Sequence, residues 1–357
     1  MPVSIVGVQN IIKYAKTVGK TVRCSGYRHT WTNVFSDDGE ILISLLPIDE
    51  AVQLPWIPTK FRPFPGSLQQ INLLPATETP DGQHINCYIG TATTNEQFRQ
   101  WAISPTGGKS KWSLPLNVIM VEITFGGSIS AICHGAGINH QTLSDLVVEV
   151  EYVDCHGELR TVSDPELLRA AAGGLGVFGV VVGYTVRLDK MTYAAMRPSK
   201  QPIELAIPPP KEYVTLAQSG DPQYAYIKTL VAKHTQAELD AAYTQFVNIA
   251  EGDFYSEWFW FPLQSDGWVN CWKNDGDEKD ASEIPSPFMI FLEWLEEWIM
   301  EEVNNWSVWQ ALPGELQAKL FGFLALSTSS NVKEGQPSRT LPPLPLLSLP
   351  LLFFVWL

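Results

Sequence analysis

The sequence predicts an α+β protein with many strands and few helices. Short runs of β-branched and other apolar residues recur along the chain, most strongly over 177–188, and segments with helical spacing are fewer. Of the 357 residues, 45% are hydrophobic and 17% are charged, so the chain holds enough apolar side chains for two packed domains. An aromatic content of 11% excludes a disordered chain.

The first elements are a helix and two strands. Apolar residues at helical spacing over 8–15 predict a helix, and Gly19 would end it. An extended segment over 21–24 and a strand over 40–46 should follow, because both runs are rich in β-branched or apolar residues.

The middle of the chain continues with a strand over 86–91 and a second helix. Thr94 is suited to cap that helix, and Gln97 at the third helical position would complete a capping box. The run over 118–124 alternates as a strand does, and it leads directly into a glycine-rich segment.

A hairpin and a third helix come next. The strands over 145–153 and 159–162 are separated by the turn sequence Asp-Cys-His-Gly, which favours a hairpin. Ser163 and Glu166 have the spacing of a capping box for the helix that follows.

The charge distribution predicts two domains with different surfaces. The formal net charge is -14, which argues against a nucleic-acid partner because a polyphosphate would be repelled. Residues 201–330 carry 20 acidic and 6 basic side chains, so the rest of the chain is neutral overall. We therefore expect one domain over 1–195, an acidic domain over 196–330, and a low-complexity tail rich in Pro and Leu over 331–357.

Cysteine spacing and the two ends of the chain restrict the class of protein further. The five cysteines form no CxxC pair, so we expect neither a disulfide framework nor a metal site. The first residues lack a signal-peptide pattern. The apolar run over 341–357 contains four prolines and is too short for a convincing membrane helix. We expect an intracellular protein, cytoplasmic or mitochondrial, with membrane association weakly supported.

Three glycine-rich bends are the candidate functional segments. Residues 25–31 follow a strand and contain Arg28 and His29, so backbone N–H groups and a fixed charge could meet an anion. Residues 126–137 are mostly Gly, Ser and Ala, which leaves bare backbone for a bulky ligand. Residues 174–179 spell GxGxxG, but a helix precedes them and a strand follows, which is the reverse of a dinucleotide-binding fold.

Four ordered segments together resemble a known family. They are VRCSGYRHTW (22–31), GGSISAICHGAG (126–137), LSDLVVEVEYVDCHGEL (143–159) and ELLRAAAGGLGVFGVVVGYTVRL (166–188). The chain resembles the vanillyl-alcohol oxidase superfamily, in the branch of the D-arabinono-1,4-lactone and alditol oxidases. The resemblance implies a two-subdomain PCMH-type FAD-binding domain followed by a partial α+β substrate (cap) domain.

The resemblance also implies which residues contact FAD. His29 matches the histidine that often bonds covalently to the flavin; non-covalent FAD beside His29 and a plain surface histidine are the alternatives. No catalytic residue is assigned. The residues carried over as cofactor-binding are Gly26, Tyr27, Arg28, His29, Thr30, Ser128, Cys133, His134, Gly135, Gly137, Gly179 and Val181.

The function that the resemblance implies is FAD-dependent oxidation of a CH–OH group. A sugar lactone or polyol would give hydride to the flavin, and dioxygen would then be reduced to hydrogen peroxide. Two departures favour an alternative, a truncated and catalytically weak flavin-binding protein: the family's leading strand is missing, and no His-Trp dipeptide occurs. A third alternative, an NAD-dependent dehydrogenase, rests on the GxGxxG sequence alone.

Overall fold

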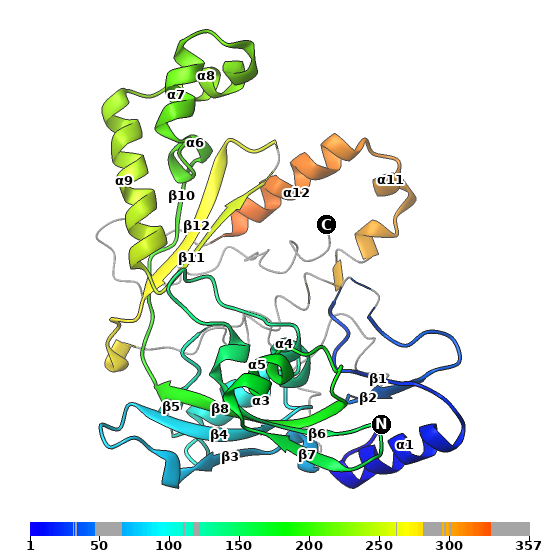
Figure 1. Ribbon diagram of the computed structural model, residues 1–357. Helices are drawn as coiled ribbons and strands as arrows, with labels where there is room; N and C mark the ends of the chain where they lie inside the picture. Colours follow the sequence, from blue (N-terminus) through cyan, green and yellow to red (C-terminus); the bar gives the residue numbers. More distant parts are fainter. Residues whose placement is uncertain are drawn as a thin grey trace. The chain divides into compact units, whose positions relative to one another are not determined.

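The computed structural model describes residues 1–46 except 31 and 33, 66–116 except 110, 122–280 except 262, and 295, 298, 299 and 302–329. These residues divide into two compact units (Figure 1). The first unit contains residues 1–135 and 140–191, and the second contains residues 136–139 and the chain from Thr192 onward. The predicted tail over 331–357 lies outside the described residues.

A six-stranded antiparallel sheet forms the centre of the first unit. Its strand order is β3-β4-β8-β6-β7, and β5 also pairs with β8. Helices α3, α4 and α5 cover one face of this sheet (Figure 1). The elements of this layer are β3 (Ile71–Leu74), β4 (His84–Gly90), α3 (Asn95–Ile103), β5 (Trp112–Ser113), α4 (Phe125–Ser130), β6 (Val147–Val153), β7 (Leu159–Val162), α5 (Pro165–Ala172) and β8 (Val180–Lys190).

The alternation of side chains along the central strand, β8, determines which of its residues join the core. Side chains of a strand alternate between the two faces of a sheet. Tyr184, Val186 and Leu188 of β8 are all 0% exposed and pack in one cluster with residues of α3, α4 and α5. The intervening residues, such as Arg187, are polar or small and lie on the other face. Alternation in the sequence therefore fixes which face of β8 packs against α3, α4 and α5.

A smaller parallel pair carries the first glycine-rich bend. Strands β1 (Val22–Ser25) and β2 (Ile41–Ser44) pair with Ser25 opposite Ser44. Helix α1 (Ile5–Thr17) packs beside them and contributes to a second apolar cluster. The remaining short elements of the first unit are the 3₁₀ helices η2 (Ser67–Gln69), η3 (Pro75–Thr77) and η4 (Leu143–Leu146).

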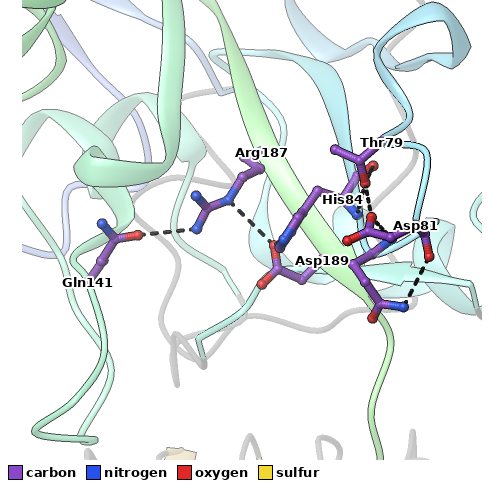
Figure 2. A network of polar contacts seen from close by, with 7 residues as sticks. Thr79, Asp81, His84, Gln141, Arg187 and Asp189 are labelled. Carbon is purple, nitrogen blue, oxygen red and sulfur yellow. Dashed lines mark hydrogen bonds and ion pairs between the residues drawn. The ribbon is translucent and has the colours of Figure 1, made fainter.

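A polar network lies where β4 begins and β8 ends, at one end of these two paired strands (Figure 2). Asp189 of β8 lies opposite His84 of β4, and Asp189 Oδ1 is 2.8 Å from His84 Nδ1. Arg187 Nε lies 3.5 Å from the same oxygen, and Arg187 also donates to Gln141 Oε1 at 3.2 Å. Thr79 accepts a hydrogen bond from the His84 amide. These contacts connect the β3–β4 turn to β8, so we interpret the network as structural.

The second unit packs helices against one face of an aromatic-rich sheet. Strand order is β10-β12-β11, with β9 pairing to β12. Val269 and Cys271 of β12 are buried against Ala206. The elements are β9 (Ala195–Met196), β10 (Ser199–Pro202), α6 (Ile203–Ala206), α7 (Lys211–Gln218), η5 (Pro222–Tyr224), α8 (Ala225–Val231), α9 (Gln236–Gly252), β11 (Tyr255–Trp260), β12 (Asp266–Lys273), η6 (Glu278–Asp280), α11 (Ser307–Gln310) and α12 (Gly314–Thr328).

Most of the predicted elements are present, and two local predictions were wrong. The cap of α5 is Asp164 and not Ser163, because the Asp164 carboxylate accepts from the amides of Glu166 and Leu167. The first half of the segment 126–137 is helical rather than an open loop. The strand predicted over 118–124 falls largely on residues outside the described ranges. Over the described residues, none of the helices is long and apolar enough to cross a membrane.

Candidate functional site

The first bend leaves β1 with an unusual backbone. Ser25 is buried at the end of the strand, and its carbonyl accepts a hydrogen bond from the Leu45 amide at 2.9 Å. Arg28 then has a φ of 65°, in the left-handed region. Within the described chain, the backbone N–H groups of Gly26, Arg28, His29 and Thr30 donate no hydrogen bond to another residue. The amides of Arg28, His29 and Thr30 are consecutive, and consecutive free amides can bind an anion.

Gly26 places the first bend directly against the second. A Cβ built on Gly26 would lie 2.2 Å from Thr124 Oγ1, so only glycine permits this approach. Thr124 is itself fixed by pairing with Thr94, and the Phe125 amide donates to the Thr93 carbonyl at 2.9 Å. Residues 98 positions apart in the sequence are thus in van der Waals contact.

The second bend begins as a short helix that is anchored to the core. Thr124 caps α4 by accepting from the Gly127 amide, and Phe125 and Ile129 are almost fully buried. At the end of the helix, Ser130 Oγ lies 2.9 Å from the hydroxyl of Tyr184 in β8. The glycine-rich segment therefore has a defined position relative to the sheet.

The third bend meets both the second bend and the end of β6. A Cβ on Gly173 would lie 2.9 Å from Ile132 Cδ1, and one on Gly179 would lie 2.3 Å from the Val153 carbonyl oxygen. Gly179 also has a φ of 144°, which side-chain-bearing residues rarely adopt. The structure thus brings the three predicted bends into one connected region of the first unit.

Backbone strain is concentrated in these same bends. Among the described residues, five non-glycine residues have positive φ, and three of them are Arg28, Ile132 and Leu175, one in each bend. A β-branched residue such as Ile132 at a φ of 57° is a clear outlier. Residues held in such conformations cluster at ligand-binding and active sites, where the surrounding structure enforces them.

His29 lies beside an acidic residue that precedes the second bend. Its Nε2 atom is 3.1 Å from Glu122 Oε1, and the two side chains are only 15% and 11% exposed. The imidazole also meets the buried ring of Tyr27 edge-on, with ring centroids 5.8 Å apart. Nε2 nevertheless has no partner with hydrogen-bond geometry, so the contact with Glu122 is one of charge and proximity.

The chemistry of this region fits a large ligand that has an anionic part and a flat apolar part. Free amides and Arg28 supply the anion-binding groups of the first bend. The second and third bends expose apolar side chains, including Ile132, Leu175 and Val177, which is 84% exposed. The diphosphate and tricyclic ring of FAD present these two kinds of surface. In the described residues, no group of three or more His, Cys, Asp or Glu side chains is arranged to hold a metal ion.

The predicted site residues differ in what their side chains contact. Ser128 is buried, and its hydroxyl already donates to the Thr124 carbonyl at 3.0 Å. Burial raises the pKa of the Cys133 thiol, which keeps it protonated. The His134 ring is exposed, and its Nδ1 lies 3.0 Å from the Gly135 carbonyl oxygen. These three side chains do not point to a role in chemistry.

Two further predicted residues have different surroundings. Val181 lies in β8 opposite Tyr152, one strand position beyond the third bend. Gly137 falls within the short segment that belongs to the second unit, so it is not among the residues that the first unit brings together.

Sequence reasoning missed the residues that connect the bends. Glu122, Thr124 and Tyr184 were not predicted as site residues, although each contacts a bend directly. The sequence could have indicated Glu122, because it is the single acidic residue in the apolar run VIMVEITF. Such a residue needs a partner when it is buried.

Solved structures share this fold. The structure of cholesterol oxidase from Brevibacterium sterolicum superposes with a TM-score of 0.56 and 17% identity, covering 91% of this chain and 55% of that one. Berberine bridge enzyme superposes with a TM-score of 0.51 and 13% identity, covering 77% of this chain and 45% of that one. The chain thus shares the mixed helix and sheet fold of these two enzymes.

One known protein is similar to this chain in sequence. D-arabinono-1,4-lactone oxidase from Candida glabrata is 27% identical over 191 residues, which are 52% of this chain and 31% of that protein. The chain therefore spans about a third of the length of this relative and about half of the solved structures. No family model matches the sequence. The relative and the fold agree with the resemblance carried by the glycine-rich segments.

Proposed function

We propose that this protein is an FAD-dependent oxidase acting on the CH–OH group of a sugar lactone or polyol, with dioxygen as electron acceptor. The observation that carries the proposal is that three strained, glycine-rich bends form one chain of contacts, the first with Thr124 and the third with Ile132, while His29 of the first bend lies beside Glu122. Weak similarity to D-arabinono-1,4-lactone oxidase supports the substrate class. Residues 1–195 would bind the cofactor and residues 196–330 would contribute to substrate binding.

The residues of the first unit have distinct tasks in this proposal. The amides of Gly26, Arg28, His29 and Thr30, with the Arg28 guanidinium, would hold the diphosphate. When bound, FAD supplies the two-electron chemistry at its ring. His29 would hold the ring covalently. Gly135 and Gly179 would leave space for the ring to approach the backbone.

Of two other functions, the order of elements disfavours one and an experiment separates the other. The GxGxxG segment lies between the end of α5 and the start of β8, so it lacks the strand-then-helix order that an NAD pyrophosphate needs. A flavin-binding protein without turnover would share the cofactor site but not the chemistry. Peroxide formation distinguishes it from the oxidase.

The test is a spectrum followed by an activity assay. Purified protein, with FAD added if it is colourless, is expected to absorb in the near-ultraviolet and blue and to keep this absorbance after gel filtration. Sugar lactones and polyols should bleach the blue band anaerobically, and air should restore it with release of hydrogen peroxide. Protein that retains no flavin at saturating FAD would contradict the proposal.

A further inference from the structure

His29 and Glu122 form a largely buried pair in the first unit. Glu122 is 9% exposed, which is unusual for an acidic residue unless it is paired. Its carboxylate lies 3.1 Å from His29 Nε2. A buried carboxylate beside one ring nitrogen makes the two nitrogens of the imidazole chemically different.

The difference concerns which nitrogen carries the proton. A neutral imidazole has one N–H and one nitrogen with a free lone pair. A negative charge 3.1 Å from Nε2 favours the tautomer with its proton on Nε2, because the positive hydrogen is then on the nitrogen nearer to the carboxylate, even without hydrogen-bond geometry. Nδ1 is left with the lone pair, and a lone pair is what a nucleophile needs.

Other contacts restrict the rotation of the ring. Tyr27 is 6% exposed and meets the imidazole at an interplanar angle of 72°, so it forms a wall on one side. Gly26 is held against Thr124, two residues after Glu122. The same close approach that joins the bends therefore also sets the separation between His29 and Glu122.

We propose that Glu122 is a positioning residue that holds the proton of His29 on Nε2 and thereby prepares Nδ1 to form the bond to the flavin. This inference rests on the proposed function, because it concerns how His29 is prepared for FAD. It assigns to Glu122 a role in attaching the cofactor and none in the oxidation of substrate.

The atoms and electrons of the attachment balance with dioxygen as oxidant. His29 Nδ1 forms a bond to the carbon of the flavin 8α-methyl group, and one C–H bond of that methyl breaks. The methyl proton and the Nε2 proton of the alkylated imidazole are released, and the two electrons of the broken C–H bond reduce the flavin ring. Dioxygen reoxidises the ring and becomes hydrogen peroxide. The role of Glu122 is to leave the lone pair of the neutral imidazole on Nδ1 during the approach.

The first measurement uses protein without flavin. Nitrogen-15 NMR of the imidazole is expected to show the Nε2–H tautomer of His29 in the unmodified sequence, and Glu122→Gln should shift the population toward Nδ1–H. His29→Gln identifies the resonance. An Nδ1–H tautomer in the unmodified protein would overturn the inference whatever the flavin does.

The second measurement is the fraction of flavin that stays with the denatured polypeptide after acid precipitation, confirmed by intact mass. Glu122→Gln is expected to bind FAD but to lower the acid-stable fraction roughly tenfold at a fixed time. An effect of this size is seen when a metal-binding histidine loses the partner of its other ring nitrogen. Glu122→Asp should restore part of it. Glu96→Gln is the matched control, because Glu96 is a similarly buried carboxylate paired with Arg99.

The outcomes separate this inference from the proposed function. Unmodified protein that binds no FAD contradicts the proposed function, and the inference falls with it. Unmodified protein with acid-stable flavin, and an equal amount in Glu122→Gln, overturns the role of Glu122 while the proposed function stands. Flavin that is bound but fully released by acid in the unmodified protein also overturns it.

Discussion

Gly26 lies so close to Thr124 that a Cβ atom on it would be 2.2 Å from the threonine hydroxyl and 2.9 Å from its methyl group. This contact joins the end of β1 to the start of α4. Its consequence is that the first and second bends keep one spacing before any ligand arrives. A site that is formed in advance loses less conformational entropy when it binds.

Gly26→Ala should therefore lower both stability and FAD retention. Overpacking of this kind typically costs about 1–3 kcal/mol. Thr124→Ala removes the clashing atoms, but it also removes the cap of α4, at about 1 kcal/mol. Chemical denaturation of the two single variants and the double variant measures the coupling. The double variant should lose less free energy of unfolding than the two single variants lose together. Equal losses would show that the two residues do not contact each other.

Arg28→Gly should separate stability from cofactor binding. A left-handed backbone costs a side-chain-bearing residue about 1–2 kcal/mol, and glycine entropy offsets about 0.5–1 kcal/mol of that. We expect an unchanged or slightly raised free energy of unfolding and weaker binding of FAD in a titration. Lys109→Gly is the control, because Lys109 has a φ of 55° outside the bends. Equal FAD affinity in Arg28→Gly would remove the guanidinium from the site.

Tyr184→Phe should change the alkaline limit of stability. Burial raises the pKa of Tyr184 to about 12 from 10.0, while its hydrogen bond with Ser130 partly opposes the shift. The folded state thus holds this proton longer than the unfolded state does. The stability that this group contributes is complete below pH 10 and is lost as the pH rises toward 12, by about 3 kcal/mol in all.

Unfolding curves of Tyr184→Phe and of the unmodified protein, measured at several pH values, isolate this contribution. Tyr184→Phe should cost about 0.5–1.5 kcal/mol at neutral pH, because the Ser130 hydroxyl loses its partner. Between pH 10 and 12 the variant should then lose less stability than the unmodified protein. Parallel pH profiles for the two proteins would show that Tyr184 does not titrate from a buried position.

His29→Ala should abolish acid-stable flavin. The His29 side chain is the proposed point of attachment, so FAD in this variant should be released by acid while gel filtration of the native protein still shows some bound flavin. His134→Ala is the control, because its ring is exposed and its Nδ1 lies 3.0 Å from the neighbouring Gly135 carbonyl oxygen. Fluorescence that follows the denatured polypeptide in His29→Ala would refute the assignment of His29.

Gly135→Val should lower the amount of flavin that the protein retains. Gly135 lies at the end of the second bend, where a branched side chain would crowd the approach of a flat ring to the backbone. Flavin per polypeptide after gel filtration measures the effect, with circular dichroism as the check on folding. Unchanged stoichiometry in a folded variant would remove this part of the second bend from the site.

Local signals in the sequence were sufficient for several elements. Thr94 and Gln97 form the capping box that their spacing predicts, since both reciprocal hydrogen bonds are local. The hairpin of β6 and β7 follows its turn sequence in the same way. The order of α5, bend and β8 also matched, which is why GxGxxG could be discounted as a dinucleotide signature.

Long-range packing decided what the sequence could not show. Gly126, Gly127 and Ser128 occupy the middle of α4, and their low helix propensity disfavours a helix there. It forms because Thr124 caps it and because Phe125 and Ile129, four residues apart, are buried together. The distance from His29 to Glu122 likewise depends on the meeting of two bends 93 residues apart. The strain at Ile132 is also a product of tertiary contacts.

The central claim is that the three bends form one flavin site, and equilibrium titration of the purified chain with FAD tests it most directly. The flavin absorbance should saturate at one FAD per chain in the unmodified protein. Gly26→Ala, Ile132→Asp and Gly179→Val, one change in each bend, should each weaken binding while the protein stays folded by circular dichroism. If folded variants of any bend bind FAD as tightly as the unmodified chain, that bend is not part of the site and the account is wrong.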